Sequence, residues 1–137
     1  MQNRFLSALQ EFGFHPSQKP ILVAVSGGVD SMVLAALFFE SSIAIGVAHC
    51  NYQLRGVASN KDEELVRNWC SERGIPFHLA RIDTEGLAKS TNRSIQMVAR
   101  DERYRFFKEL MNLHNYSVTA LAHHADDRIE TLLMNIL

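Results

Sequence analysis

The feature that most constrains the fold is a small-residue loop between an apolar run and a helical segment. The run 21–25 has the composition of a buried strand, and Ser26-Gly27-Gly28-Val29-Asp30-Ser31 follows it directly. Two adjacent glycines let backbone N–H groups turn toward an anion without interference from a Cβ atom. A helix predicted over 30–41 adds the unpaired donors and the positive dipole end of its N-terminus. This order of strand, loop and helix predicts a phosphate-binding turn in an α/β fold.

Asp30 is the unusual member of this loop, because a carboxylate beside a phosphate repels it unless a divalent cation lies between them. Ser26 and Ser31 offer hydroxyl groups to phosphate oxygens. The loop therefore predicts a nucleotide bound as its Mg2+ complex, with Asp30 as a metal ligand. The simpler alternative is a tight turn that binds nothing. The loop is not a G-x-x-x-x-G-K-[ST] motif, since no Lys follows the glycines, and it is not G-x-G-x-x-G.

Strand-like and helix-like segments alternate along the whole chain, which is typical of a parallel sheet covered by helices. We predict a three-layer α/β/α domain of the Rossmann-like kind. The expected strands are 21–26, 43–49, 76–82 and 117–122, and the expected helices are 3–12, 30–41, 59–73, 94–113 and 125–137.

Composition narrows the classes of partner. The 137 residues carry 14 Lys and Arg against 15 Asp and Glu, so a nucleic-acid surface over the whole chain is not expected. Cys50 and Cys70 lack the spacing of a zinc ribbon or a redox pair. Because no run reaches the ~18 apolar residues of a membrane span, we predict no membrane partner and a cytoplasmic location.

The spelling S-G-G-x-D-S resembles the loop of the PP-loop ATP pyrophosphatase superfamily. Enzymes of that superfamily split ATP between its α- and β-phosphates and release pyrophosphate. The resemblance implies that ATP is bound by Ser26, Gly27, Gly28, Val29, Asp30 and Ser31.

Four segments in order and spacing are similar to the tRNA(Ile)-lysidine synthase family: the loop, 49–56, 96–104 and 123–131. That resemblance implies an adenine nucleotide α-hydrolase-like sheet with the visible strands in the order 3-2-1-4 and a fifth strand lost. It implies that 1–137 is an N-terminal ATP-binding catalytic domain, truncated at its C-terminal end, with tRNA-binding C-terminal domains absent. Its implied substrates are ATP with Mg2+, free lysine and tRNA(Ile).

The segment His123 to Thr131 follows the last predicted strand, so it lies at the same sheet edge as the loop. Its carboxylates Asp126, Asp127 and Glu130 could hold or orient Mg2+, or cap a helix dipole instead. The segment matches the family pattern H-x-x-D-D-x-x-E-T. This match implies that Asp127 is a metal ligand, that Glu130 is a second catalytic carboxylate and that His123 contacts the nucleotide.

Arg100 and Arg103 match the arginines of the family helix E-x-x-A-R-x-x-R-Y. At a spacing of i, i+3 both project from one helix face and could hold a phosphate as a fork. We expect one or both to neutralise the α-phosphate of ATP. The alternative is an exposed pair neutralised by Asp101 and Glu102.

The chain departs from the family at three places. Tyr52-Gln53 stands where His-Gly is typical, Gln96 where Glu is typical, and Arg128 where Gln is common. These departures leave the roles of those positions open. Arg55, which is kept, could contact phosphate, RNA or only solvent.

The function implied by the family is ATP-dependent ligation of lysine to carbon 2 of the wobble cytidine in the CAU anticodon of tRNA(Ile). An adenylated intermediate gives lysidine, AMP and pyrophosphate. The alternatives are another PP-loop ATP pyrophosphatase, or a nucleotide-binding module without activity in this piece. A homodimer is left open, as is the assignment of the carboxylates to metal binding or to proton transfer.

Overall fold

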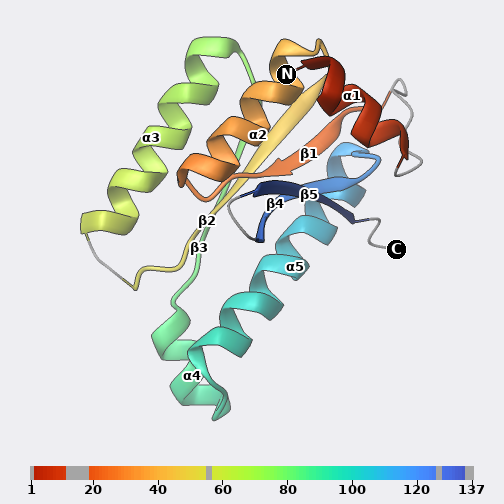
Figure 1. The fold of residues 1–137 in the computed structure, drawn as a ribbon. Helices are drawn as coiled ribbons and strands as arrows, with labels where there is room; N and C mark the ends of the chain where they lie inside the picture. The colour runs from red at the N-terminus through yellow and green to blue at the C-terminus, as the bar shows by residue number, and fades with distance from the viewer. Residues whose placement is uncertain (1, 12–18, 55–56, 126–127, 135–137) are drawn as a thin grey trace.

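The structure is a computed structural model that describes residues 2–11, 19–54, 57–125 and 128–134. Helices and strands alternate along most of the chain (Figure 1). In order they are α1 (Gln2–Glu11), β1 (Ile21–Ala24), α2 (Val29–Glu40), β2 (Ile45–Asn51), α3 (Val57–Arg73), β3 (Phe77–Arg81), α4 (Thr84–Thr91), α5 (Ile95–His114), β4 (Thr119–Ala125) and β5 (Arg128–Met134).

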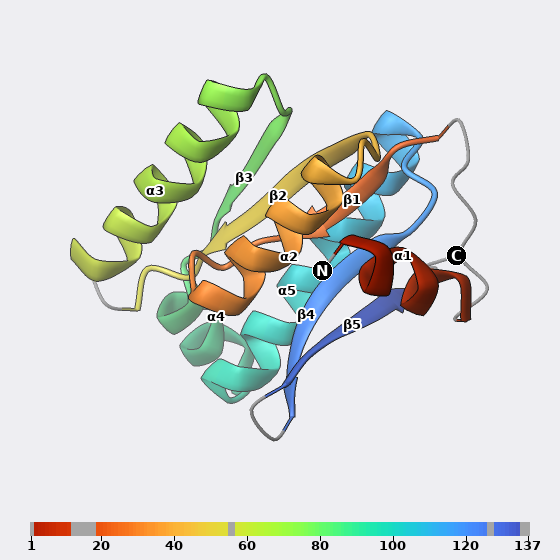
Figure 2. The ribbon, with the colours of Figure 1, turned by 45° about the horizontal axis from the view of Figure 1, so that its top comes forward.

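The strands form one sheet in the order β3-β2-β1-β4-β5 (Figure 2). β3, β2, β1 and β4 run parallel, and Val23 of β1 pairs with Val47 on one side and Ala120 on the other. The predicted parallel sheet and its strand order 3-2-1-4 are therefore confirmed. Because β1, β2 and β4 are parallel, their carboxyl ends open at the same edge of the sheet, and there the loop after β1 begins.

The two faces of the sheet are covered by different helices, which gives the predicted three-layer α/β/α architecture (Figure 1). Alternate residues of β1 point to opposite faces. Val23 belongs to a buried cluster with side chains of α1, α2 and α3, including the fully buried Phe38 and Val66. Leu22 belongs to a second cluster, in which Phe107 of α5 is the largest fully buried side chain. Of these helices, α5 alone covers the second face, so it also forms one wall of any binding site on that face.

The short helix α4 was not predicted from the sequence. Its N-cap is Asp83, whose side chain accepts a hydrogen bond from the Gly86 N–H, and Asn92 ends it in the left-handed region. Ser94 then caps α5 by accepting from the Met97 N–H, so α4 and α5 pack as a hairpin. None of the helices in the described ranges is long and apolar enough to cross a membrane.

The helix predicted over 125–137 is wrong for the described part of that segment. Residues 128–134 form β5, which runs antiparallel to β4 with Ala122 opposite Thr131. The outer edge of β4 would otherwise present unpaired backbone groups, and pairing with β5 satisfies them. Ile129 and Thr131 are β-branched, and a short apolar run fits either helix or strand by periodicity.

Candidate functional site

The phosphate loop, residues 26–31, is ordered by its own two serines. The Gly28 N–H donates to Ser26 Oγ over 3.2 Å, and Ser31 Oγ donates to the Gly28 carbonyl over 3.0 Å. The two hydroxyl oxygens lie 3.1 Å apart. Because Ser31 uses its proton toward Gly28, the Ser26 hydroxyl is the donor between them, and the bonds close a ring. In this arrangement the serines shape the loop, and the backbone N–H groups that they do not engage are the candidate donors to a phosphate.

Gly27 and the start of α2 supply these donors. Gly27 has φ +95, a conformation that L side chains rarely adopt. The first hydrogen bond of α2 runs from the Met32 N–H to the Gly28 carbonyl over 3.1 Å, so the earlier N–H groups of the turn have no acceptor within the helix. A Cβ atom on Gly27 would lie 3.1 Å from the Cβ of Asp62. The loop is therefore packed directly against the start of α3.

His49 supports the loop from inside the sheet. The side chain is buried, and its Nδ1 lies 2.7 Å from the carbonyl oxygen of Val25, the residue before the loop. Because that oxygen can only accept, Nδ1 is the donor of this hydrogen bond, and Nε2 has no partner among the described residues. Among those same residues, no group of three or more His, Cys, Asp or Glu could hold a metal ion. Within the described part of the chain, His49 thus acts as a support for the loop.

A cleft of about 210 Å³ opens beside the phosphate loop, between the sheet and α5. It is smaller than the ~300–1,000 Å³ usual for a complete small-molecule site, so it suits one part of a nucleotide while the rest lies along the loop. Its walls are Ala24, Val25, Ser26, Ser31, Ala48, Cys50, Tyr52, Arg103, Phe107, Leu121 and Ala122. The cleft therefore brings both loop serines and Arg103 together, although they are more than seventy positions apart in the sequence.

Cys50, Tyr52 and Arg103 form the polar wall of this cleft. Burial raises the pKa of the Cys50 thiol to about 11, against the smaller opposing effect of a hydrogen bond from Tyr52. Burial also raises the pKa of Tyr52, so its hydroxyl stays protonated beside the Arg103 guanidinium. The Nε of Arg103 is buried and has no hydrogen-bond partner among the described residues. A buried guanidinium N–H without an acceptor is a donor available to an anion.

The two predicted arginines are separated by the structure. Both guanidinium groups lie over the ring of Tyr104, at 5.8 Å for Arg100 and 5.2 Å for Arg103. Arg103 lines the cleft, whereas Arg100 is exposed and is not among the lining residues. The spacing of i, i+3 correctly puts both arginines on one face of α5. That face is longer than the cleft, so only Arg103 lies within it.

Tyr52 is the cleft residue that sequence reasoning did not assign. The only signal for it was its place in a segment directly after β2, at the sheet edge that carries the loop. The raised pKa of the neighbouring Cys50 is typical of a buried thiol of low reactivity.

Several predicted site residues lie outside the part of the chain that the structure describes. Asp126, Asp127 and Arg55 are among them, and so are the side chains of His123 and Glu130, whose backbones belong to β4 and β5. Their assigned roles stay predictions.

Curated relatives are similar to the chain over nearly its whole length. A tRNA(Ile)-lysidine synthase from Chlorobaculum tepidum is 43% identical over 98% of this chain and 42% of that protein. One from Bacteroides thetaiotaomicron is 38% identical over 100% of this chain and 32% of that protein. The chain thus spans less than half the length of these relatives.

Solved structures show the same fold at low identity. An NH3-dependent NAD synthetase from Campylobacter jejuni matches with a TM-score of 0.66 at 17% identity, over 86% of this chain and 53% of that one. An NMN synthetase from Francisella tularensis matches with a TM-score of 0.63 at 15% identity, over 86% and 51%. The sequence pattern of the PP-loop domain matches residues 1–137. With the strand, the two-glycine loop and the helix in place, the chain belongs to the PP-loop domain family.

Proposed function

We propose that this chain is the ATP-splitting part of an enzyme that ligates lysine to carbon 2 of the wobble cytidine of tRNA(Ile), with release of AMP and pyrophosphate. The names of the relatives support the substrate, and the match to the PP-loop domain supports the use of ATP. One structural observation carries the chemistry. The phosphate loop and Arg103 line the same cleft at the carboxyl edge of the sheet.

The phosphate loop is proposed to hold the β- and γ-phosphates. Backbone N–H groups of residues 27–31 are the proposed donors, with the Gly28 N–H exchanging its bond to Ser26 Oγ for a phosphate oxygen. The α2 dipole adds positive potential. The hydroxyl groups of Ser26 and Ser31 hold the loop in shape. The Ser31 hydroxyl would donate to a phosphate oxygen only if that oxygen replaced the Gly28 carbonyl as its acceptor. Base or ribose would then fill the cleft between β1, β2, β4 and α5.

Mg2+ is proposed to arrive with ATP as part of the substrate. Asp30 lies in the first turn of α2, beside the phosphates in this arrangement. One protein carboxylate suits Mg2+ that is mostly held by phosphate oxygens and water. Asp127 is the proposed second ligand, and the ion would neutralise the charge that develops on departing pyrophosphate.

Arg103 is proposed to neutralise the α-phosphate during adenylation. The O2 atom of the cytosine attacks the α-phosphorus, and the bond to the β-phosphate breaks with release of pyrophosphate. The ε-amine of lysine then attacks carbon 2, the carbon–oxygen bond breaks with release of AMP, and the amine loses a proton. Glu130 is the proposed acceptor of that proton. The reaction would take place in the cytoplasm, and the grip on tRNA would lie in parts of the protein beyond these residues.

The product formed from ATP tests this proposal. ATP labelled at the α-phosphate is incubated with Mg2+, lysine and tRNA(Ile) with a CAU anticodon, using this chain and a version extended to the length of its relatives. The proposal expects AMP from the extended protein only when lysine and tRNA are both present. AMP without either would favour another PP-loop pyrophosphatase, and bound but intact ATP would favour a binding module.

A further inference from the structure

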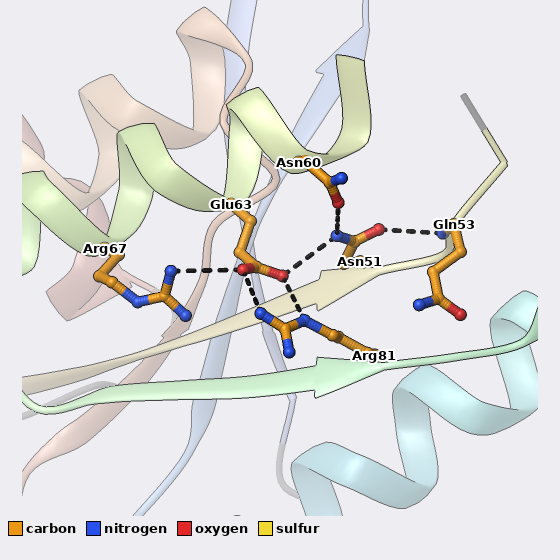
Figure 3. A network of polar contacts seen from close by, with 6 residues as sticks. All are labelled: Asn51, Gln53, Asn60, Glu63, Arg67 and Arg81. Carbon is orange, nitrogen blue, oxygen red and sulfur yellow. Dashed lines mark hydrogen bonds and ion pairs between the residues drawn. The ribbon is translucent and has the colours of Figure 1, made fainter. Parts of the chain in front are cut away.

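We propose that Glu63 is a positioning residue that sets two walls of the ATP site from the opposite face of the sheet. The inference rests on the proposed ATP site and adds a residue outside it. Glu63 lies on α3, and its carboxylate meets the ends of β2 and β3 (Figure 3). It touches neither the cleft nor the phosphate loop, so any effect on the reaction acts through other residues.

The Glu63 carboxylate is buried and fully partnered. Arg81 of β3 grips it as a fork, with Nε at 3.0 Å from one oxygen and Nη2 at 2.8 Å from the other. Arg67 approaches at 3.3 Å and Asn51 donates at 3.1 Å. The side chain of Glu63 is only 6% exposed, and the hydrogen bonds from Arg81 lower its pKa to about 2. A fork of this kind fixes orientation as well as distance.

The charge of Glu63 fixes the orientation of the Asn51 side chain. A carboxylate can only accept, so the Asn51 Nδ2 must face it, and the same nitrogen also donates to Asn60 at 3.1 Å. The Asn51 Oδ1 is thereby turned toward the N–H of Gln53, which donates to it over 3.0 Å. Gln53 has φ +56, an unusual conformation for a residue other than Gly, and this hydrogen bond supports it.

The turn at Gln53 holds Tyr52 in the cleft. Tyr52 lies between the two residues that the Asn51 hydrogen bond joins, and its carbonyl accepts from the buried Thr84 hydroxyl over 2.9 Å. Neighbouring residues of an extended segment point to opposite faces, so Asn51 meets Glu63 on the α3 face while Tyr52 lines the cleft on the α5 face. Glu63 therefore fixes the position of Tyr52 through Asn51 and Gln53, and Tyr52 lies in the same cleft wall as Arg103.

The second wall is the phosphate loop. Asp62 is the neighbour of Glu63 on α3, and it packs against Gly27 closely enough that a Cβ there would lie 3.1 Å from the Asp62 Cβ. The fork between Glu63 and Arg81 ties this end of α3 to β3. A shift of α3 would therefore move Asp62, which supports the phosphate loop, and would also move Tyr52. Only the carboxylate of this ion pair is buried, since the Arg81 side chain is 57% exposed, and the fork fixes the direction in which that carboxylate points.

The variants Glu63→Gln and Glu64→Gln, made in a chain of the length of the relatives, test the inference. Glu64 is the matched control because it is adjacent, carries the same charge and is exposed. Thermal melts first establish a temperature at which every variant is folded. At that temperature kcat/KM for AMP formation should fall on the order of 100-fold in Glu63→Gln, as expected for small displacements of reacting groups, and stay unchanged in Glu64→Gln.

A readout without ATP separates this inference from the proposed function. Cys50 lies beside Tyr52 in the cleft, so its alkylation rate, located by peptide mass, reports whether Tyr52 is still in place. We expect faster alkylation in Glu63→Gln than in Glu64→Gln. An unchanged rate in a folded Glu63→Gln protein would overturn the positioning role. A wild-type protein that forms no AMP would instead overturn the proposed function.

A double variant distinguishes positioning from mere stability. Arg81→Gln leaves the buried Glu63 carboxylate without its fork, and adding Glu63→Gln removes that buried charge, so the melting temperature should partly recover relative to Arg81→Gln alone. Catalysis and the Cys50 rate should not recover, because the fork that orients α3 is still missing. Parallel recovery of all three would contradict the inference. If Glu63→Gln does not fold, Arg67→Gln removes only the partner at the longer distance, 3.3 Å, and should change Cys50 alkylation in the same direction, to a smaller extent. An unchanged rate there would count against the inference.

Discussion

The two ends of the sheet carry polar side chains of different kinds. The carboxyl end has charged groups around an open cleft, with Asp30 in the first turn of α2 and a buried donor of Arg103 that lacks a partner among the described residues. The amino end has an aromatic cluster of His78, His114 and Tyr116. There the Nε2 of His78 lies 2.7 Å from the hydroxyl of Tyr116, and the rings of His78 and His114 are 4.5 Å apart. The carboxyl end therefore has a donor that can bind a ligand, whereas the polar side chains of the amino end contact one another.

This difference predicts that substitutions at the two ends have separable effects on chemistry and on stability. Changes at the carboxyl end should alter chemistry while the fold persists. Changes at the amino end should alter stability while the chemistry of the folded protein persists. The predictions below test that division, beginning with the largest effect.

Asp30→Asn should have the largest effect on activity. The amide keeps the shape of the side chain and removes the charge proposed to hold Mg2+, so AMP formation should fall about 1,000-fold. Steady-state assays with labelled ATP give the rate, and thermal melting should stay close to wild type. An active, folded Asp30→Asn protein would remove Asp30 from the mechanism.

Arg103→Gln should lower kcat/KM for AMP formation about 100-fold, because it removes the donor in the cleft. Arg100→Gln is its counterpart on the same helix, outside the cleft, and should have the smaller effect of the two. Equal losses in the two variants would contradict the separation of the arginines.

Gly46→Ala should act at the amino end. A Cβ there would lie 1.9 Å from the Tyr116 hydroxyl oxygen, so the ring must move. Overpacking of this kind costs about 1–3 kcal/mol of unfolding free energy. Denaturant unfolding measures the loss. The folded variant should retain wild-type ATP affinity, and weaker binding in proportion to the lost stability would argue against independent ends.

The smallest effect should be a pH dependence of stability. Burial, followed by repulsion from His114, lowers the pKa of His78 below its ordinary 6.5. The folded protein thus favours neutral His78, and the unfolded chain binds more protons as the pH falls below 6.5. The contribution of His78 is therefore present above pH 6.5 and is lost as the pH falls through its folded pKa. Denaturant midpoints for wild type and His78→Gln, compared between pH 7.5 and 5.5, should diverge at high pH and converge at low pH.

The framework of the fold could be predicted from the sequence because its signals are local. The apolar run 21–25, the glycines after it and the later strands each act within a few residues, and their order gives a parallel sheet. The segment 128–134 could not be assigned correctly, because a short apolar run fits helix or strand until its neighbour in space is known. That neighbour is β4, with which residues 128–134 pair as an antiparallel strand.

The site was predicted less completely, for a related reason. The phosphate loop is contiguous, so Ser26 and Ser31 were assigned to it from the sequence alone. Which of Arg100 and Arg103 lines the cleft depends on how α5 lies on the sheet. The role of Glu63 depends on a partner eighteen positions away, Arg81. A charged residue in a helix normally faces solvent, so nothing local distinguished Glu63 from Glu64.

Hydrogen exchange with and without MgATP tests the central claim most directly, in a chain of the length of the relatives. The account predicts slower exchange in residues 26–31 and in the strand ends that line the cleft, with no change around Gly46 and His78. Protection at the amino end, or none at the phosphate loop despite bound ATP, would contradict it.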